Sequence, residues 1–245
     1  MWRMVWKEIL DAVYPRRCPI CSEILVSRER KICGICSEEL PLLMEPRCKK
    51  CSKPVLAHEQ EYCFDCVKQQ HHYTKGFACF PYNDKLKKSL SEFKYHAKRE
   101  YAEFYVDSMV RSLGEWIYKT NAEVLIPVPL HKNKYKQRGF NQAQLLAEGL
   151  SKALSIPADT KLLVRTVDTI PQKKLDNKER MRNLEMAFSI STNGERSEEF
   201  FPYKRVILVD DIYTTGSTIE ACTKVLQRAG CLEVFFVAVC IGSGF

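Results

Sequence analysis

The chain has 245 residues and a formal net charge of +8, and its 45% hydrophobic and 28% charged residues are the balance of a soluble globular protein. No apolar run approaches the roughly 20 residues that span a bilayer, and the N-terminus lacks the apolar stretch of a signal peptide. We therefore expect a cytoplasmic protein without a stable membrane span. The positive charge favours polyanionic partners such as nucleic acid or phosphate ligands, without choosing between them.

The N-terminal segment predicts a short amphipathic helix. Its apolar side chains Trp2, Val5, Trp6 and Ile9 share one helical face. We expect this face to pack on its own domain, and peripheral attachment at the inner face of the membrane is the alternative.

A cysteine repeat dominates residues 1–72. Eight of the twelve cysteines form four evenly spaced Cys-x-x-Cys pairs, namely Cys18, Cys21, Cys33, Cys36, Cys48, Cys51, Cys63 and Cys66. In a chain without a secretory signal, paired cysteines indicate metal ligands rather than disulfides. Because zinc takes four ligands and each pair supplies two, we expect two structural zinc ions in a small domain that depends on metal for its folding energy.

Sequential pairing of the repeat is the simplest arrangement, with the first two pairs holding one ion and the last two pairs holding the other. The sequence leaves cross-braced pairing open. Free or disulfide-bonded cysteines are a less favoured alternative, and an iron–sulfur cluster is a further rival for the same ligands.

After an expected linker at 69–75, the pattern changes to alternating strands and helices. Strands are expected at 77–82, 123–130, 162–164, 205–209 and 234–241. Helices are expected at 85–113, at 141–154 with Asn141 as its cap, and at 217–229 before Gly230, with a short charged helix or ordered loop at 177–187. Unbroken apolar strands that alternate with helices indicate an α/β domain over 77–245, with a parallel sheet covered on both faces.

The most specific motif follows the strand expected at 205–209. Two acids, Asp210 and Asp211, precede a loop whose candidate ligand-binding residues are Tyr213, Thr214, Thr215, Gly216, Ser217 and Thr218. Backbone N–H groups and the N-terminus of the next helix favour a phosphate, hydroxyls add donors, and Gly216 lets the backbone approach the ligand. The carboxylates suit sugar hydroxyls or a divalent cation that bridges ribose and pyrophosphate. The pattern indicates a ribose 5-phosphate ligand, and a strand followed by a well-capped helix is the alternative.

This segment closely resembles the motif by which type I phosphoribosyltransferases bind 5-phosphoribosyl pyrophosphate. Three further stretches narrow the resemblance to the ComF family of competence proteins. They are Pro-Val-Pro-Leu-His at 127–131, Arg-Gly-Phe-Asn-Gln at 138–142, and the segment 172–188 with Gln172, Leu175, Arg180, Asn183, Ala187 and Phe188. Phe-Lys-Tyr at 93–95 is similar to the first-helix segment of the family, and the cysteine repeat resembles its N-terminal double zinc ribbon.

The resemblance implies a type I phosphoribosyltransferase-like parallel sheet flanked by helices and preceded by a small zinc-ribbon domain. It implies that the loop with Pro129 faces the pyrophosphate, where Arg138 is the first choice for a contact. It also places Arg180 in a flexible lid, so that Asp210, Asp211 and Arg180 are the candidate catalytic residues and magnesium accompanies the ligand. For the lysines of 132–138, a solvated basic loop is the alternative.

Two functions agree with these features. The first is a competence factor for DNA uptake in natural transformation, which binds a phosphoribosyl ligand and either single-stranded DNA, through basic residues near 85–99 and 132–138, or a helicase-like ATPase partner. The second is an active phosphoribosyltransferase that moves ribose 5-phosphate to an unidentified nitrogen acceptor. The intact acid pair favours catalysis, but no segment indicates a particular purine or pyrimidine.

Overall fold

The computed structural model describes residues 15–27, 29–166, 186–191 and 201–243 of the chain. Its centre is a four-stranded sheet with the strand order β1-β6-β5-β2. The strands are β1 (Lys75–Pro81), β2 (Val124–Pro127), β5 (Arg205–Tyr213) and β6 (Glu233–Ile241). All neighbouring strands are parallel, which confirms the parallel sheet predicted from the alternation of strands and helices.

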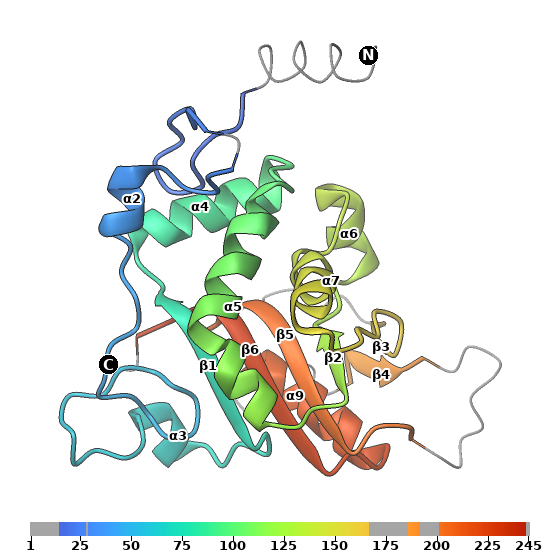
Figure 1. Cartoon of the computed structure of the whole chain (residues 1–245). Coiled ribbons are helices and arrows are strands. Elements are labelled where there is room, and N and C mark those ends of the chain that lie inside the picture. The colour runs from blue at the N-terminus through green and yellow to red at the C-terminus, as the bar shows by residue number, and fades with distance from the viewer. Residues whose placement is uncertain (1–14, 28, 167–185, 192–200, 244–245) are drawn as a thin grey trace, which may run out of the picture.

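Helices cover both faces of this sheet (Figure 1). One face carries α4 (Asp84–Tyr95), α5 (Tyr101–Lys119) and α7 (Gln142–Leu154), and the other carries α9 (Ser217–Arg228). The buried side chains of the two faces form two separate apolar clusters. This two-sided cover removes the strands from water, as their unbroken apolar sequences require.

Two smaller features lie beside the sheet. The short helix α6 (Lys132–Arg138) follows β2. A solvated basic loop was the alternative interpretation of this segment from the sequence. The strands β3 (Leu163–Arg165) and β4 (Phe188–Ile190) form a separate antiparallel hairpin. The weak strand expected at 162–164 therefore exists, but it does not join the parallel sheet.

One predicted helix is wrong in its extent. The helix expected at 85–113 is divided into α4 and α5 because the chain turns at Ala97, whose backbone is left-handed with a φ of 53°. The apolar spacing continues across this turn from Phe93 to Tyr101, so periodicity alone predicts one helix where there are two. The helix after Asn141 is confirmed, with the Asn141 side chain accepting a hydrogen bond from the Ala143 amide.

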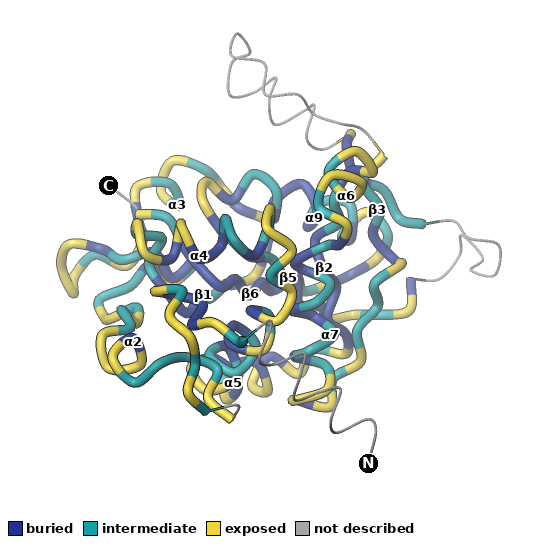
Figure 2. The backbone as a smooth tube through the Cα atoms, turned by 90° about the horizontal axis from the view of Figure 1, so that it is seen from above, coloured by how far each residue is buried: buried dark blue, intermediate teal, exposed yellow. Residues whose placement is uncertain are grey.

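The cysteine repeat forms two small units, which we call the first ribbon (residues 15–40) and the second ribbon (residues 45–68). Each contains one short helix, α2 (Gly34–Glu38) in the first and α3 (Phe64–Lys68) in the second. The first ribbon shares an apolar cluster with α4 and α5, and the second shares the cluster of α9. The ribbons lie at opposite ends of the molecule (Figure 1), and both are more exposed than the strands of the sheet (Figure 2).

Within the described ranges, none of the helices combines the length and the apolar character that crossing a bilayer requires. The amphipathic N-terminal helix expected from Trp2, Val5, Trp6 and Ile9 lies outside the described residues.

Gly76 in β1 tests how closely the sheet is packed. A Cβ atom at Gly76 would lie 1.9 Å from Cε1 of Phe236 on the neighbouring strand β6. We expect Gly76→Ala to lower the free energy of unfolding by about 1–3 kcal/mol, because the added methyl group forces the ring or the backbone to move. Urea unfolding measures this change.

Gly114→Ala is the matched control. A Cβ atom at Gly114 in α5 would lie 3.7 Å from Leu154, which is an ordinary contact. Replacing a helical glycine by alanine should raise the free energy of unfolding by about 0.5–1 kcal/mol. Equal effects of the two substitutions would contradict the packing described for β1 and β6.

Candidate functional site

Two loops that leave the same edge of the sheet form the candidate site. Pro127 at the end of β2 lies opposite Val209 in β5, so the segments that follow these strands are neighbours. The Val128 amide donates to the Val209 carbonyl at 2.9 Å, which joins the two segments. Ligands of open α/β sheets bind at this carboxyl edge of the strands.

The N-terminus of α9 supplies hydrogen-bond donors at this edge. Gly216 is the N-cap residue, and no side chain caps the helix. Thr214 and Thr215 are exposed, and the hydroxyl oxygens of Thr215 and Ser217 lie 2.9 Å apart. First-turn N–H groups, the positive end of the helix dipole and hydroxyl donors together suit a phosphate group.

Gly216 is required by the packing beneath the loop. Its φ of 81° lies in the left-handed region. A Cβ atom would lie 2.5 Å from the hydroxyl of Tyr213 and 3.0 Å from Cε1 of His71. From the sequence, Gly216 was expected for a different reason, namely that it lets the backbone approach a ligand.

Tyr213 turns its side chain into the core. The side chain is fully buried, and its hydroxyl is hydrogen-bonded to the hydroxyl of Tyr73 at 2.7 Å. The phenol of Tyr213 therefore points into the core, and a ligand contact through the Tyr213 backbone stays a prediction.

The two carboxylates at the end of β5 face different surroundings. Asp210 accepts a hydrogen bond from the Asp211 amide at 2.8 Å. Burial, followed by the negative charge of Asp211, raises the pKa of Asp210 well above its ordinary value. A divalent cation beside the pair would remove the repulsion between the acids and lower that pKa, so binding of a cation and release of a proton are linked.

Lys94 of α4 forms an ion pair with Asp211. Only 16% of the Lys94 side chain and 12% of the Asp211 side chain are exposed. Burial alone would lower the pKa of Lys94, but the charge and hydrogen bond of Asp211 outweigh burial and raise it. The raised pKa keeps Lys94 protonated at the sheet edge, where its charge balances that of Asp211.

Lys94 is the site residue that reasoning from the sequence missed. The segment 93–95 carried a signal, because Phe-Lys-Tyr is similar to a stretch of the ComF family, but Lys94 was expected only among the basic residues near 85–99 that would bind DNA, and not at the phosphate site. The partner, Asp211, lies on a strand far away in the sequence. Only the packing of α4 against the sheet brings the two side chains together.

Arg138, the expected pyrophosphate contact, lies at the end of α6 beside the same group. Its guanidinium donates to Gln142 Oε1 at 2.9 Å and to the Tyr95 hydroxyl at 3.0 Å. Its central carbon lies 4.8 Å from the centre of the Tyr95 ring. The charge of Arg138 opposes the rise in the pKa of Lys94, so the two cations act within one electrostatic environment.

Pro129 and Arg180 complete the expected set. Pro129 is half-buried in the segment after β2. Among the described residues the one cis peptide bond precedes Pro46, so Ile126–Pro127 and Val128–Pro129 are trans. Arg180, with most of the segment expected to act as a lid, lies outside the described residues.

The eight paired cysteines form two separate groups of four. Cys18, Cys21, Cys33 and Cys36 make one group, and Cys48, Cys51, Cys63 and Cys66 make the other. Within each group the sulfur atoms all lie within 4.8 Å of one another. Sequential pairing is thus confirmed over the cross-braced alternative.

The sulfur separations fit zinc. The Sγ atoms of Cys21 and Cys33 are 3.7 Å apart, and those of Cys51 and Cys63 are 3.6 Å apart. Four ligands at Zn–S bonds of about 2.3 Å in a tetrahedron lie about 3.8 Å from one another. Each group supplies four thiols and leaves no ligand position for water, so the ions have a structural role.

Comparison with known proteins matches both parts of the chain. Residues 9–67 match the family described as a double zinc ribbon domain, and residues 137–243 match the phosphoribosyl transferase domain. The chain is 34% identical over 190 residues to Competence protein F of Haemophilus influenzae, which covers 73% of this chain and 78% of that protein.

Two further relatives extend over more of the chain. Competence protein ComFC of Bacillus subtilis is 28% identical over 212 residues, or 84% of this chain and 82% of that protein. DNA utilization protein YhgH of Escherichia coli K12 is 26% identical over 229 residues, or 92% of this chain and 97% of that protein. With both halves of the architecture matched, and with Competence protein F similar across most of its length, the chain belongs to the ComF family of competence proteins.

Proposed function

We propose that this chain acts in DNA uptake as a competence protein that binds 5-phosphoribosyl pyrophosphate, or a related phosphoribosyl ligand, together with Mg²⁺. The observation that carries this proposal is the N-terminus of α9, free of any capping side chain, which follows the Asp210–Asp211 pair after the short segment 212–216. The names of the relatives, two competence proteins and a DNA utilization protein, support the biological setting.

Each part of the ligand has a candidate partner. The loop Thr214–Thr218 suits the 5-phosphate, and Asp210 and Asp211 suit the ribose diol or the Mg²⁺ ion. Arg138 and Lys94 supply positive charge for the pyrophosphate. When Mg²⁺ is bound it would neutralise the charge of the pyrophosphate. Arg180 is proposed as a further contact from a closing lid.

Transfer of ribose 5-phosphate is the second candidate function. A nitrogen of the acceptor would form a bond to C1 of the ribose, while the bond from C1 to the pyrophosphate oxygen breaks and pyrophosphate leaves. The acid pair and the two cations favour this activity, because they can hold the sugar and the leaving group through an oxocarbenium-like transition state. Release of pyrophosphate in the presence of candidate bases tests it.

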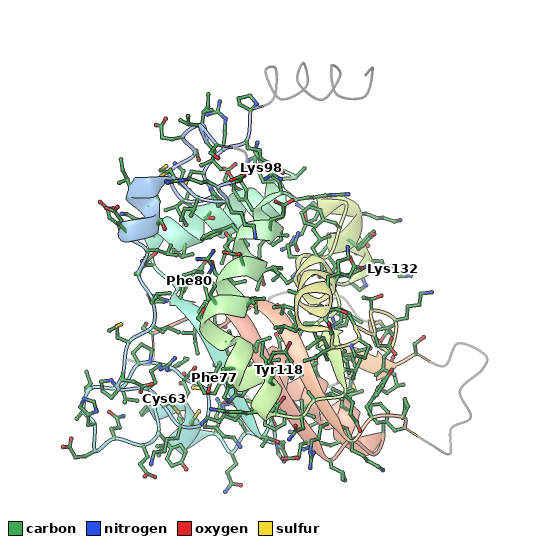
Figure 3. All side chains as sticks on the ribbon, in the orientation of Figure 1. Cys63, Phe77, Phe80, Lys98, Tyr118 and Lys132 are labelled. Atoms are coloured by element: carbon green, nitrogen blue, oxygen red, sulfur yellow. The ribbon has the colours of Figure 1, made fainter. Side chains whose placement is uncertain are left out.

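Single-stranded DNA is the proposed macromolecular partner, and a helicase-like ATPase of the uptake machinery is the alternative. Basic residues of α4 and α6 are accompanied by two exposed aromatic rings, Tyr95 (52% exposed) and Tyr135 (49% exposed). Lys98 and Lys132 lie at the same end of the molecule, away from Cys63 in the second ribbon (Figure 3). Cations that follow a backbone and rings on which bases stack are the usual elements of single-strand binding. We place this function in the cytoplasm, with attachment at the inner face of the membrane as the alternative.

The first prediction of this function concerns zinc. We expect two zinc ions per chain after purification under reducing conditions, measured by metal analysis with thiol titration. Cys33→Ser should lose one ion and unfold mainly the first ribbon, because a site with three ligands loses affinity. Fewer than one zinc ion per chain with free thiols would overturn the assignment, and iron with visible absorption would favour the iron–sulfur alternative.

The second prediction concerns the phosphate loop. Thr215→Val removes a hydroxyl at nearly constant volume and should weaken binding of 5-phosphoribosyl pyrophosphate with Mg²⁺ by about 1–3 kcal/mol, the value of a hydrogen bond to a charged group. Asp211→Ala should remove most of the dependence of binding on Mg²⁺. Titration calorimetry measures both effects.

Thr223→Val is the matched control for Thr215→Val. Thr223 lies on the same helix α9, is fully buried, and has a hydroxyl without a partner among the described residues. The substitution should leave binding unchanged and the fold intact. If the wild-type protein gives no Mg²⁺-dependent heat with 5-phosphoribosyl pyrophosphate, the proposed ligand is wrong.

The third prediction concerns DNA. Binding to single strands should weaken steeply with salt, and Lys136→Ala should lower the slope of log affinity against log salt by about 0.7, the value for one phosphate contact. Tyr135→Ala should weaken binding by about 1–3 kcal/mol, with little effect on the slope, because it removes a stacking surface. Lys152→Ala, an exposed lysine on α7, is the control. An affinity that does not depend on salt would leave the helicase-like partner as the better proposal.

A further inference from the structure

The segment between the second ribbon and β1 is part of the core. The sequence predicts a linker at 69–75, but Tyr73 is fully buried and His71 is 9% exposed. The rings of His71 and Tyr73 stack, with centroids 4.9 Å apart. A segment that holds two buried rings fixes the position of the second ribbon relative to the sheet.

Tyr73 joins the second cysteine group to the phosphate loop. Its hydroxyl lies 4.0 Å from the Sγ atom of Cys66 and 2.7 Å from the hydroxyl of Tyr213. The Tyr213 ring stacks on Phe236 with centroids 4.5 Å apart, and Tyr73 meets the same ring edge-on at 5.0 Å. Gly216 rests directly on the Tyr213 hydroxyl, which a Cβ atom at Gly216 would approach to 2.5 Å.

A second link runs to the first turn of α9. The buried carboxylate of Glu220 accepts a hydrogen bond from the His72 amide at 2.8 Å and contacts the His72 ring. His71 Nδ1 lies 3.6 Å from Glu220 Oε2, the same oxygen that accepts the hydrogen bond from the His72 amide. The segment after the second ribbon therefore holds both the loop, through Tyr213, and the helix whose N-terminus would receive the phosphate.

The first ribbon has a different set of contacts. It is tied to α5 by ion pairs of Arg16 with Glu103 and of Lys31 with Asp107. Its buried cysteines belong to the apolar cluster of α4 and α5, on the face of the sheet opposite α9. In the described part of the chain, the phosphate loop is supported by the second ribbon and not by the first.

We infer that Tyr73 and His71 are positioning residues that couple the metal site of the second ribbon to ligand binding at the phosphate loop. With that site formed, Cys66 fixes the start of the segment, Tyr73 supports Tyr213, and the loop is held ready for a phosphate. Without it, the loop must be ordered when the ligand binds, which weakens binding. The inference rests on the proposed function for the identity of the ligand. The link from Cys66 through Tyr73 to Tyr213 does not depend on that function.

The coupling is reciprocal by thermodynamic necessity. A ligand that binds more tightly when the second site holds its ion must also make that site hold its ion more tightly. One of the two zinc ions, and not both, should therefore be protected from a chelator by 5-phosphoribosyl pyrophosphate with Mg²⁺. This gives a measurement of metal release that does not depend on catalysis.

The test compares equivalent cysteines of the two ribbons. Cys66→Ser and Cys36→Ser should each lose one zinc ion. Calorimetry with 5-phosphoribosyl pyrophosphate and Mg²⁺ should show affinity at least roughly tenfold lower for Cys66→Ser, the equilibrium factor of 1.4 kcal/mol, and little change for Cys36→Ser. Equal losses in the two variants, or none in either, would overturn the coupling.

Tyr73→Phe keeps the ring and removes only the hydroxyl, so it tests the link without removing a metal ligand. It should retain two zinc ions and bind the ligand roughly fivefold more weakly, the effect of one net hydrogen bond. Tyr101→Phe is the control, because Tyr101 is equally buried but lies in the cluster of the first ribbon. Unchanged affinity of Tyr73→Phe would contradict the role of the hydroxyl.

Hydrogen exchange of 214–220 without any ligand separates this inference from the proposed function. Exchange should be faster in Tyr73→Phe than in the wild-type protein, and it should be unchanged in Tyr101→Phe. If the wild-type protein does not bind 5-phosphoribosyl pyrophosphate, the proposed ligand fails, while faster exchange would still support the structural link. Identical exchange in the three proteins would overturn the link, whatever the ligand.

Discussion

The central strand β5 sets the main constraint on this molecule. It pairs with β2 on one side and β6 on the other, and its residues Val206–Val209 are fully buried. A central strand favours apolar residues, yet β5 carries two adjacent acids near its carboxyl end, in surroundings too enclosed for full hydration. The helices around the carboxyl edge are arranged so that these acids find partners, with α4 supplying Lys94 and the backbone supplying the Asp211 amide.

An ion pair as enclosed as Lys94–Asp211 adds little net stability, because removing both charges from water costs about as much as their attraction returns. Its clearer consequence is electrostatic. The raised pKa of Lys94 keeps its ammonium group protonated beside Asp211, and Arg138 adds a second cation nearby. A site with matched charges of both signs can accept a ligand that carries phosphates and a divalent cation at once, since each component finds an opposite charge.

Local signals in the sequence were sufficient for the parallel sheet, the Asn141 cap, the loop before α9 and the four Cys-x-x-Cys pairs, because apolar runs, caps and cysteine spacing act within a few residues. The choice between sequential and cross-braced pairing of the cysteines required the structure. The turn at Ala97 was not predictable, since the apolar period continues through it. The role of Lys94 was not predictable either, because its partner Asp211 lies on a distant strand. Tyr73 and His71 looked like part of a polar linker, and their burial depends on Tyr213, Phe236 and Glu220, which come much later in the chain.

The two ribbons also show why a repeat in sequence need not be a repeat in function. The first is tied to α5 by ion pairs with side chains that are about one third to one half exposed, and such contacts are screened by water and salt. In the second, the Lys53 side chain is 3% exposed, pairs with Asp65 and donates to the Ser243 carbonyl at 3.3 Å. Removing the second ribbon would take away the Lys53 donor of the Ser243 carbonyl and the Cys66 sulfur that lies 4.0 Å from the Tyr73 hydroxyl. The position of each ribbon against the sheet, and not its cysteine spacing, therefore decides which one the phosphate loop depends on.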